Sequence, residues 1–221
     1  EMMDYYGMWA HQIKTPIAAM RILVQSGMDR EENEENQKLF RQLQMELFKT
    51  EQYVEMVLSY LKIGDIAKDM VLERCDLGKV VRQAVKKYSR LFILQKLSLE
   101  MGEIAEIVLT DEKWLSFVVE QILSNALKYT KSGSVSIYLE QEGVLVIKDT
   151  GIGISAEDLP RIMEKGYTGY NGRIDKRSTG IGLYLCKKVM DKLHHQLRID
   201  SEDGKGTKVV LDLRRTQLDL E

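Results

Sequence analysis

Apolar side chains recur every three or four positions through the first 64 residues of the chain. Such spacing predicts amphipathic α-helices, because positions three and four apart share one face. The pattern predicts one helix over residues 3–27, ended by Ser26-Gly27, and a second over residues 36–64, ended by Gly64. The second stripe continues for about seven turns, or about 40 Å. The apolar positions of the two stripes are Trp9, Ile13, Ile17, Met20 and Val24, then Leu39, Leu43, Leu47, Thr50, Val54, Val57 and Leu61.

A short polar segment, residues 29–35, joins the two predicted helices and holds five acidic residues and one arginine. We interpret it as a solvated connector, which makes the two helices an antiparallel hairpin. A lone hairpin exposes most of its apolar stripe, and pairing with a second copy would bury that stripe in a four-helix bundle. The sequence therefore predicts a homodimer formed through residues 3–64.

Beyond residue 64 the hydrophobic pattern changes to short strands alternating with helices. Residues 65–70 are interpreted as a linker between a first domain, residues 1–64, and a second domain, residues 71–215. Helices and a mostly antiparallel sheet in this order predict an α+β chain whose second domain is a two-layer α/β sandwich. Residues 150–179 are glycine-rich and weakly periodic, which is typical of a functional or mobile loop. Strands are predicted at 71–75, 97–101, 107–110, 134–139, 144–148, 197–201 and 207–213, and helices at 77–91, 112–129 and 180–193, with Asp76 and Asp111 as helix caps.

Composition adds little to this picture but excludes some functions. The chain is 44% hydrophobic and 30% charged with a net charge of -2, which is ordinary for a globular protein and argues against a dedicated nucleic-acid surface. Cys75 and Cys186 lie far apart without metal-ligand spacing, which is typical of a reduced cytosolic compartment. No apolar run is long enough to span a bilayer. Because the chain begins inside a helical pattern, we expect a fragment whose natural N-terminal part is absent.

The first stretch with candidate chemistry is Ala10-His11-Gln12-Ile13-Lys14-Thr15-Pro16. His11 and Thr15 are four positions apart, so they share a helix face away from the apolar stripe. Pro16 cannot donate a hydrogen bond to the carbonyl of Gln12, so we expect the helix to bend there. By itself the pattern describes a surface histidine on a kinked helix, and a chemical role for it depends on the second domain.

Two polar groups of the second domain suit a nucleotide. Asn125 and Lys128 are three apart on one predicted helix, where an amide oxygen is a hard ligand for Mg²⁺ and a lysine supplies positive charge for phosphates. Asp149 begins Asp149-Thr150-Gly151-Ile152-Gly153 directly after a predicted strand, and its carboxylate can accept a hydrogen bond from an exocyclic amine. Glycines there let a planar ligand approach the backbone. Taken singly, these are also explained as a solvent-facing pair and a turn.

Two glycine motifs follow. Ser178-Thr179-Gly180-Ile181-Gly182-Leu183 opens a predicted helix, whose first N–H groups attract anions while the glycines leave room for phosphates. Its spacing matches neither the P-loop nor the Rossmann pattern. Gly204-Lys205-Gly206-Thr207 alone predicts a hairpin turn.

Together, and in this order, these motifs resemble the ATP-binding domain of sensor histidine kinases. Residues 121–129 resemble the N box of that family, 149–153 its G1 box and 178–183 its G2 box, while 204–207 match a later glycine-threonine turn. Residues 11–16 resemble the phosphoacceptor H box, so the resemblance covers nearly the whole chain. Residues 165–173 further resemble kinases that work beside peptide-antibiotic ABC transporters.

The resemblance implies an N-terminal dimerisation and phosphotransfer domain followed by a catalytic domain of the Bergerat ATP-binding fold. His11 would take the phosphoryl group of ATP and pass it to an aspartate of a response regulator. Gln12 would orient the imidazole, and Thr15 would orient the water that dephosphorylates the regulator. The chain would be the cytoplasmic fragment of a bacterial cell-membrane protein, a homodimer that binds no nucleic acid and reaches an ABC transporter through the missing membrane part.

The resemblance also implies the nucleotide contacts, with ATP and Mg²⁺ as the bound groups. Asp149 would bind the adenine amino group, Asn125 and Gln121 would hold Mg²⁺, and residues 151–179 would form a lid over the nucleotide. The full set of implied nucleotide contacts is Asn125, Lys128, Tyr129, Asp149, Gly151, Gly153, Arg173, Thr179, Gly180, Gly182, Leu183 and Thr207.

Two departures from the family pattern leave alternatives open. Gln12 stands where many relatives have Glu or Asp, and an amide cannot take a proton at neutral pH. Gln121 stands where many relatives have asparagine. One alternative is therefore a catalytically weak pseudokinase that serves as a dimeric nucleotide-binding scaffold. Another is an ATPase of the gyrase, chaperone and mismatch-repair superfamily, which leaves the histidine hairpin unexplained.

Overall fold

The computed structural model describes residues 2–62, 70–169 and 179–215, and the side chains of residues 2–11 and 62 lie outside that description. Two compact units divide the chain, Glu1–Gly64 and Asp65–Glu221. The helix end predicted at Gly64 and most of the predicted linker, 65–70, fall outside the described residues. None of the helices in the described ranges has an apolar stretch long enough to cross a membrane.

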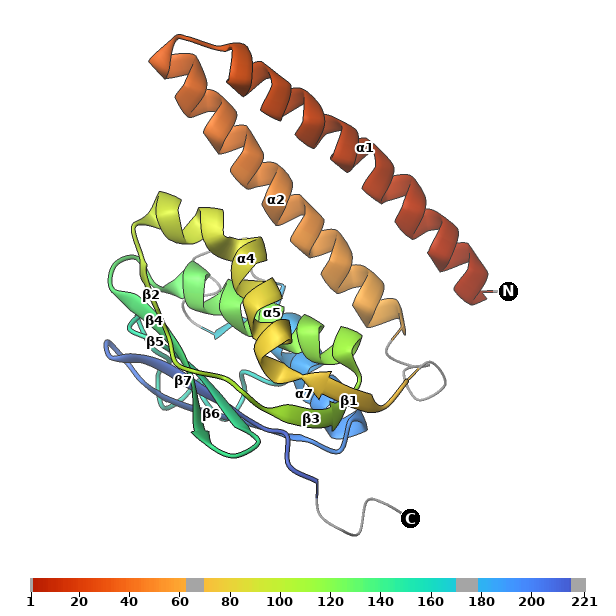
Figure 1. Cartoon of the computed structure of the whole chain (residues 1–221), viewed down its shortest axis with the longest axis vertical. Coiled ribbons are helices and arrows are strands. Elements are labelled where there is room, and N and C mark those ends of the chain that lie inside the picture. The colour runs from red at the N-terminus through yellow and green to blue at the C-terminus, as the bar shows by residue number, and fades with distance from the viewer. Residues whose placement is uncertain (1, 63–69, 170–178, 216–221) are drawn as a thin grey trace. The chain divides into compact units, whose positions relative to one another are not determined.

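The first unit is a hairpin of two helices, α1 (Met2–Arg30) and α2 (Glu34–Lys62), which pack along each other (Figure 1). Helix α1 includes Pro16 and does not end at Ser26-Gly27, so the predicted stop is wrong. A Cβ atom on Gly27 would lie 2.7 Å from two ring atoms of Phe40 in α2. The glycine therefore allows the two helices to approach closely and does not end the first one.

The turn between the two helices, residues 31–33, is shorter than the predicted connector, 29–35. Asn33 caps the start of α2, because its Oδ1 accepts hydrogen bonds from the backbone N–H groups of Glu35 at 2.8 Å and Asn36 at 3.3 Å. An asparagine at this position satisfies N–H groups that the first turn of a helix leaves unpaired. The acidic segment thus contributes the start of α2, with Glu34 and Glu35 in its first turn.

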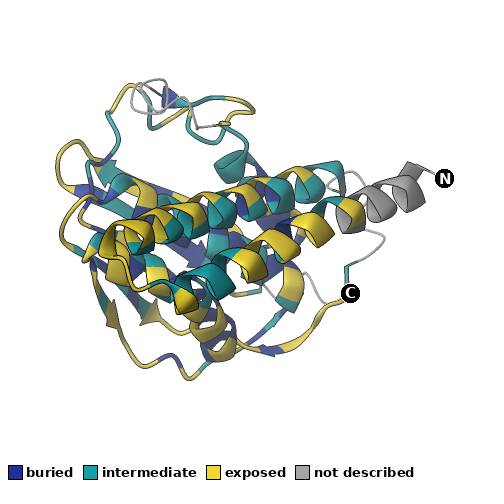
Figure 2. Cartoon of the chain, turned by 90° about the horizontal axis from the view of Figure 1, so that it is seen from above, coloured by how far each residue is buried: buried dark blue, intermediate teal, exposed yellow. Residues whose placement is uncertain are grey.

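The apolar stripe of the hairpin is only partly covered within one chain. Ile17 and Met56 are buried at 5% exposure each, whereas Met20, Leu39 and Leu43 are between 43% and 54% exposed. Figure 2 shows α1 and α2 as mostly exposed or intermediate. A single hairpin therefore leaves much apolar surface in contact with water.

Within its described residues, the second unit combines two sheets with the helices named next, which confirms the predicted α+β class. The helices α4 (Leu77–Gln95), α5 (Glu112–Tyr129) and α7 (Gly182–Lys192) lie over one face of a five-stranded sheet (Figure 1). That sheet has the order β2-β4-β5-β7-β6, and only its β2–β4 pair is parallel. Its strands are β2 (Ser98–Met101), β4 (Ser134–Gln141), β5 (Val144–Asp149), β6 (Gln196–Glu202) and β7 (Gly206–Asp212).

A separate antiparallel pair of strands, β1 (Glu73–Asp76) and β3 (Ile107–Thr110), stands beside the main sheet. The sequence did not predict that these two strands pair with each other. Both predicted helix caps are confirmed. Asp76 Oδ1 accepts a hydrogen bond from the Lys79 N–H at 2.8 Å, and Asp111 Oδ1 accepts one from the Trp114 N–H at 3.0 Å. Each carboxylate also places negative charge at the positive end of a helix.

The central strand β5 is buried on both faces, because none of the four residues from Val144 to Ile147 is more than 3% exposed. On one face Val144 and Val146 form an apolar cluster with Val210 of β7, against which Tyr138 packs. Alternate residues of a strand point to opposite faces of the sheet, so the residues that alternate with Val144 and Val146 point to the other face. The strand therefore carries Asp149, its last residue, into a buried position.

His195 is a buried polar residue at 3% exposure, and its Nε2 lies 3.1 Å from the Thr110 hydroxyl. Burial, followed by the positive charge of Arg215, lowers the pKa of His195 from 6.5 to about 4. The ring is therefore neutral at physiological pH and serves the packing between β3 and the start of β6.

Candidate functional site

The candidate site centres on Asp149, whose side chain ties together three segments of the second unit. It is 7% exposed, and its Oδ1 accepts hydrogen bonds from the Gly151 N–H at 2.8 Å and the Thr207 N–H at 3.2 Å. Burial raises the pKa of Asp149 above 3.8, while these two backbone donors oppose the rise. Among the described residues, two backbone N–H groups hold the carboxylate and no cation pairs with it, which leaves its charge available to a ligand.

Thr130 lies beside this carboxylate at the end of α5, and the sequence did not single it out. Its hydroxyl also acts to lower the pKa of Asp149. Thr130 is 2% exposed, and by strict geometry its Oγ1 has no hydrogen-bond partner within the described part of the chain. A buried hydroxyl without a full hydrogen bond is costly and suits a site that a polar ligand completes.

The glycines around Asp149 are explained by close backbone approach. A Cβ atom on Gly151 would lie 2.5 Å from the Tyr129 carbonyl oxygen and 2.8 Å from Asp149 Oδ1. Gly153 and Gly206 have φ angles of +69° and +103°, and a Cβ on either would meet backbone oxygen at 2.0 or 2.1 Å. Only glycine fits these positions, so the turn after β5 can press against the end of α5 and the start of β7.

Helix α5 presents the predicted polar face. Gln121 is buried at 8% exposure, Asn125 is half-buried and Lys128 is exposed, with its Nζ 5.1 Å from the centre of the Tyr129 ring. The Tyr129 carbonyl accepts a hydrogen bond from the Ile152 N–H at 3.1 Å. The end of α5 and the turn after β5 are therefore joined directly, which brings the predicted N box and G1 box together.

The third motif meets the same helix. Helix α7 starts at Gly182, later than predicted, and none of the side chains that the structure describes caps it at Ile181. A Cβ on Gly182 would lie 3.0 Å from Gln121 Oε1, so this amide oxygen sits at the start of α7. Gly180, with φ +65°, comes just before, and Thr179 is exposed. The uncapped first turn of α7 offers N–H groups to an anion close to an oxygen ligand suited to a divalent cation.

Other predicted residues are not placed at this site. Arg173 and Ser178 lie outside the described residues, as does much of the predicted lid. His11 lies within α1, but its side chain is also outside the description, whereas Gln12 and Thr15 are exposed on the same helix. His11, Gln12 and Thr15 belong to the first unit of the chain.

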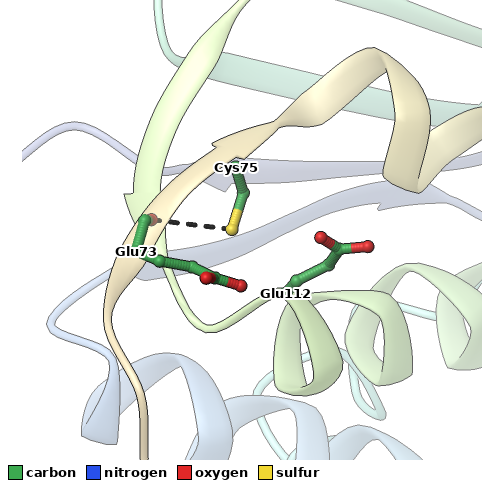
Figure 3. Close-up of side chains that lie close together, drawn as sticks. All are labelled: Glu73, Cys75 and Glu112. Carbon is green, nitrogen blue, oxygen red and sulfur yellow. Dashed lines mark hydrogen bonds between the residues drawn. The ribbon is translucent and has the colours of Figure 1, made fainter.

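A second cluster, Glu73, Cys75 and Glu112, was also missed from sequence, because strand pairing and a helix cap bring these residues together (Figure 3). One ligand atom from each lies within 4.8 Å of the others. The Cys75 thiol donates to the carbonyl oxygens of Glu73 and Thr110 at 3.5 and 3.6 Å. Lys79 Nζ lies 3.1 Å from a Glu112 carboxylate oxygen, so an ion pair already balances part of the negative charge. We assign no metal to this cluster.

Comparison with known proteins agrees with the geometry. Residues 110–217 match the family described as histidine kinase-, DNA gyrase B-, and HSP90-like ATPase. Sensor histidine kinase YxdK of Bacillus subtilis (strain 168) is 34% identical over 211 residues, covering 93% of this chain and 62% of the relative. Sensor protein kinase GraS of Staphylococcus aureus (strain MRSA252) is 35% identical over 207 residues, covering 92% and 58%. The chain thus spans about three fifths of the length of these relatives.

The fold has a counterpart among solved structures. The crystal structure of full-length ShkA in complex with AMPPNP aligns with a TM-score of 0.65 at 19% identity, covering 94% of this chain and 45% of ShkA. This likeness concerns the fold and extends over both units of the chain. The ATPase family match and the two curated relatives provide the sequence relationship. The chain is therefore related in sequence to sensor histidine kinases, and residues 110–217 of its second unit match the ATPase family.

Proposed function

We propose that the second unit binds ATP through the Asp149 site and that the γ-phosphoryl group is transferred to His11. The observation that carries the proposal is the convergence on Asp149 of the G1 turn and β7, with its Oδ1 held by two backbone donors. With Oδ1 engaged, the negative carboxylate can still accept a hydrogen bond from the exocyclic amine of adenine. The Thr130 hydroxyl and the glycine cradle at Gly151 fit a flat polar ring.

The phosphates would then extend toward the start of α7, past the polar face of α5. Asn125 and Gln121 would hold Mg²⁺, which neutralises phosphate charge when it is bound. Lys128 and Tyr129 would contact the nucleotide, as would Gly180, Gly182, Leu183 and Thr207. Arg173 and Thr179 are proposed as further contacts from the segment between the G1 and G2 boxes.

His11 would act as a nucleophile in its neutral form, which is well populated near pH 7 because the unperturbed pKa of histidine is about 6.5. A bond forms between a ring nitrogen and the γ-phosphorus, the bond to the bridging oxygen breaks, and ADP leaves. The other ring N–H can donate to the Gln12 amide oxygen, which orients the ring but cannot remove a proton. We therefore expect slow transfer. An aspartate of a response regulator would receive the phosphoryl group.

Further parts of the proposal concern partners and location. The exposed stripe on α1 and α2 supports a homodimer joined in a four-helix bundle. Thr15 would orient water for dephosphorylation of the regulator. Because the relatives are longer than this chain, we propose a membrane part beyond it and, through that part, contact with an ABC transporter.

The central test is incubation with γ-labelled ATP and Mg²⁺. Wild-type protein should acquire acid-labile, alkali-stable label, and His11→Gln should acquire none. His194→Gln, at an exposed histidine of the second unit, serves as the matched control and should label like wild type. Equal labelling of His11→Gln would exclude His11 as the acceptor.

Gln12 favours a second candidate function, a nucleotide-binding scaffold without phosphotransfer. In that case wild type binds ATP with the affinity that the Asp149 site provides and never acquires label. Restoring an acid with Gln12→Glu distinguishes slow from absent chemistry, because it should raise the labelling rate of a working kinase and leave a scaffold unlabelled. The Gln12 side chain is exposed, so this substitution should not perturb folding.

A further inference from the structure

The segment that precedes the undescribed part of the lid, residues 155–169, is fastened by a side-chain contact between its two ends. The Tyr167 hydroxyl donates a hydrogen bond to Asp158 Oδ1. The Arg161 guanidinium lies over the Tyr167 ring, 4.2 Å from its centre, and pairs with Glu164 at 3.2 Å. At the start of the segment, the Ser155 carbonyl accepts hydrogen bonds from the N–H groups of Asp158 and Leu159 at 3.1 and 3.0 Å.

The same segment contacts the glycine turn that leads into α7. The Gly166 N–H donates to the Gly180 carbonyl at 2.9 Å. A Cβ atom on Gly180 would lie 2.4 Å from the Gly166 carbonyl carbon and 2.7 Å from Tyr167 N. The backbone of residues 166–167 therefore packs directly against Gly180, and its position helps to set the conformation of the turn before α7.

These contacts form a chain from Asp158 through Tyr167 to Gly180. The hydroxyl–carboxylate bond fixes the Tyr167 side chain, Arg161 covers its ring, and the adjoining backbone holds Gly180. A hydrogen bond to a charged group is stronger than one between neutral groups. Because Asp158 and Tyr167 are both half-buried, this bond is partly shielded from water.

We propose that Tyr167 and Asp158 are positioning residues for nucleotide binding. Their hydrogen bond keeps residues 166–167 against Gly180, so the N–H groups at the start of α7 are already arranged for phosphates before nucleotide arrives. The inference rests on the proposed nucleotide site, since it assigns the Gly180 turn to the phosphates. Neither residue touches the reacting atoms, so the effect falls on nucleotide affinity and not on the transfer step.

The test uses Tyr167→Phe, which removes the hydroxyl and leaves the ring beneath Arg161. We expect the Kd and KM for ATP to rise about 3- to 10-fold, because part of the free energy of a charge-assisted hydrogen bond would be lost from nucleotide binding. The kcat at saturating ATP should not change. In nucleotide-free protein, hydrogen exchange at the Gly166 amide should accelerate by a similar factor. Tyr138→Phe, at a half-buried tyrosine on β4, is the matched control and should change neither quantity.

Variants of the acceptor complete the test. Asp158→Asn retains an amide oxygen that can accept from Tyr167, so it should lose less affinity than Asp158→Ala, which should lose as much as Tyr167→Phe. The double variant, Tyr167→Phe with Asp158→Ala, should lose no more than either alone. Additive losses in the double variant would overturn the inference.

Unchanged ATP affinity in Tyr167→Phe would also overturn it, whether or not Gly166 exchange accelerates. Failure of the underlying site is read separately, from Asp149→Asn measured in parallel. If that variant binds ATP like wild type, the nucleotide site itself is misassigned. If it loses binding while Tyr167→Phe does not, only the positioning role fails.

Discussion

Asp149→Asn offers a sharp separation of binding from folding at the proposed site. An asparagine can direct its amide oxygen to the backbone donors of Gly151 and Thr207, which Asp149 Oδ1 accepts at 2.8 and 3.2 Å. Its NH₂ group then occupies the position of Oδ2. A donor there faces the exocyclic amine of adenine, which is itself a donor, so the proposed contact is lost and replaced by an unfavourable one.

The magnitudes follow from the charge and burial of Asp149. Loss of a hydrogen bond to a charged acceptor costs about 1.5–3 kcal/mol, so ATP affinity should fall by about 10- to 150-fold. Folding should not suffer. Burial raises the pKa of Asp149 above 3.8, so its favourable contribution to stability is present below that pH and is lost as pH rises through the raised pKa. At pH 7 the buried charge is a cost that a neutral asparagine avoids.

Calorimetry with a non-hydrolysable ATP analogue and urea unfolding measure the two quantities on the same preparation. We expect Asp149→Asn to unfold at the same urea concentration as wild type or a higher one, and to bind the analogue at least tenfold more weakly. Asp149→Ala, which removes the acceptor of both backbone donors, should lose stability as well as affinity. Retained affinity in Asp149→Asn would refute the adenine contact, and a loss of stability would refute our account of the buried charge.

Three further predictions concern stability and assembly. The pKa of His195 is about 4 in the folded chain and 6.5 ordinarily. Its contribution to the free energy of unfolding is therefore fully present above pH 6.5 and is lost as the pH falls toward 4. Unfolding titrations should show that wild type loses about 3 kcal/mol by pH 4 relative to His195→Gln. Gly206→Ala should lower the free energy of unfolding by more than the roughly 1–3 kcal/mol of backbone strain, because its Cβ would also clash with backbone. Gly204→Ala has φ +77° but open space around it, so it should lose only the strain energy. Equal losses of stability in thermal unfolding would contradict the clash with backbone. Wild type should have a light-scattering mass of twice the 25.5 kDa chain, and Leu43→Glu should halve it where Gln42→Glu does not; a wild-type monomer would rule out the bundle.

Interactions between residues close together in sequence account for most of the helix boundaries that were predicted correctly. The caps at Asp76 and Asp111 were correct because an N-cap depends on residues within one turn of the helix. The end of α1 was predicted wrongly at Gly27, because a glycine that stops an isolated helix can instead admit a neighbouring ring, here Phe40 of α2. That outcome depends on packing between segments, which the order of residues along one helix does not reveal.

The candidate site shows the same division. The motifs at residues 121–129, 149–153, 178–183 and 204–207 were visible in sequence because each needs particular residue types at fixed short spacing. Thr130 was not visible, since a threonine after a helix has no signature of its own. Nor was the contact between Tyr167 and Asp158, nine residues apart in a segment without regular structure, or the cluster around Cys75, assembled by strand pairing.

The order of residues thus determined which elements form, which side chains carry charge, and to which family of kinases the chain is related, because periodicity, caps and motifs act over a few residues. Only the tertiary structure decided that the Asp149 carboxylate is buried and held by the N–H groups of Gly151 and Thr207. Asp149 and Thr207 lie 58 residues apart in sequence, and their burial and hydrogen bond depend on the pairing of β5 with β7, which only folding brings about.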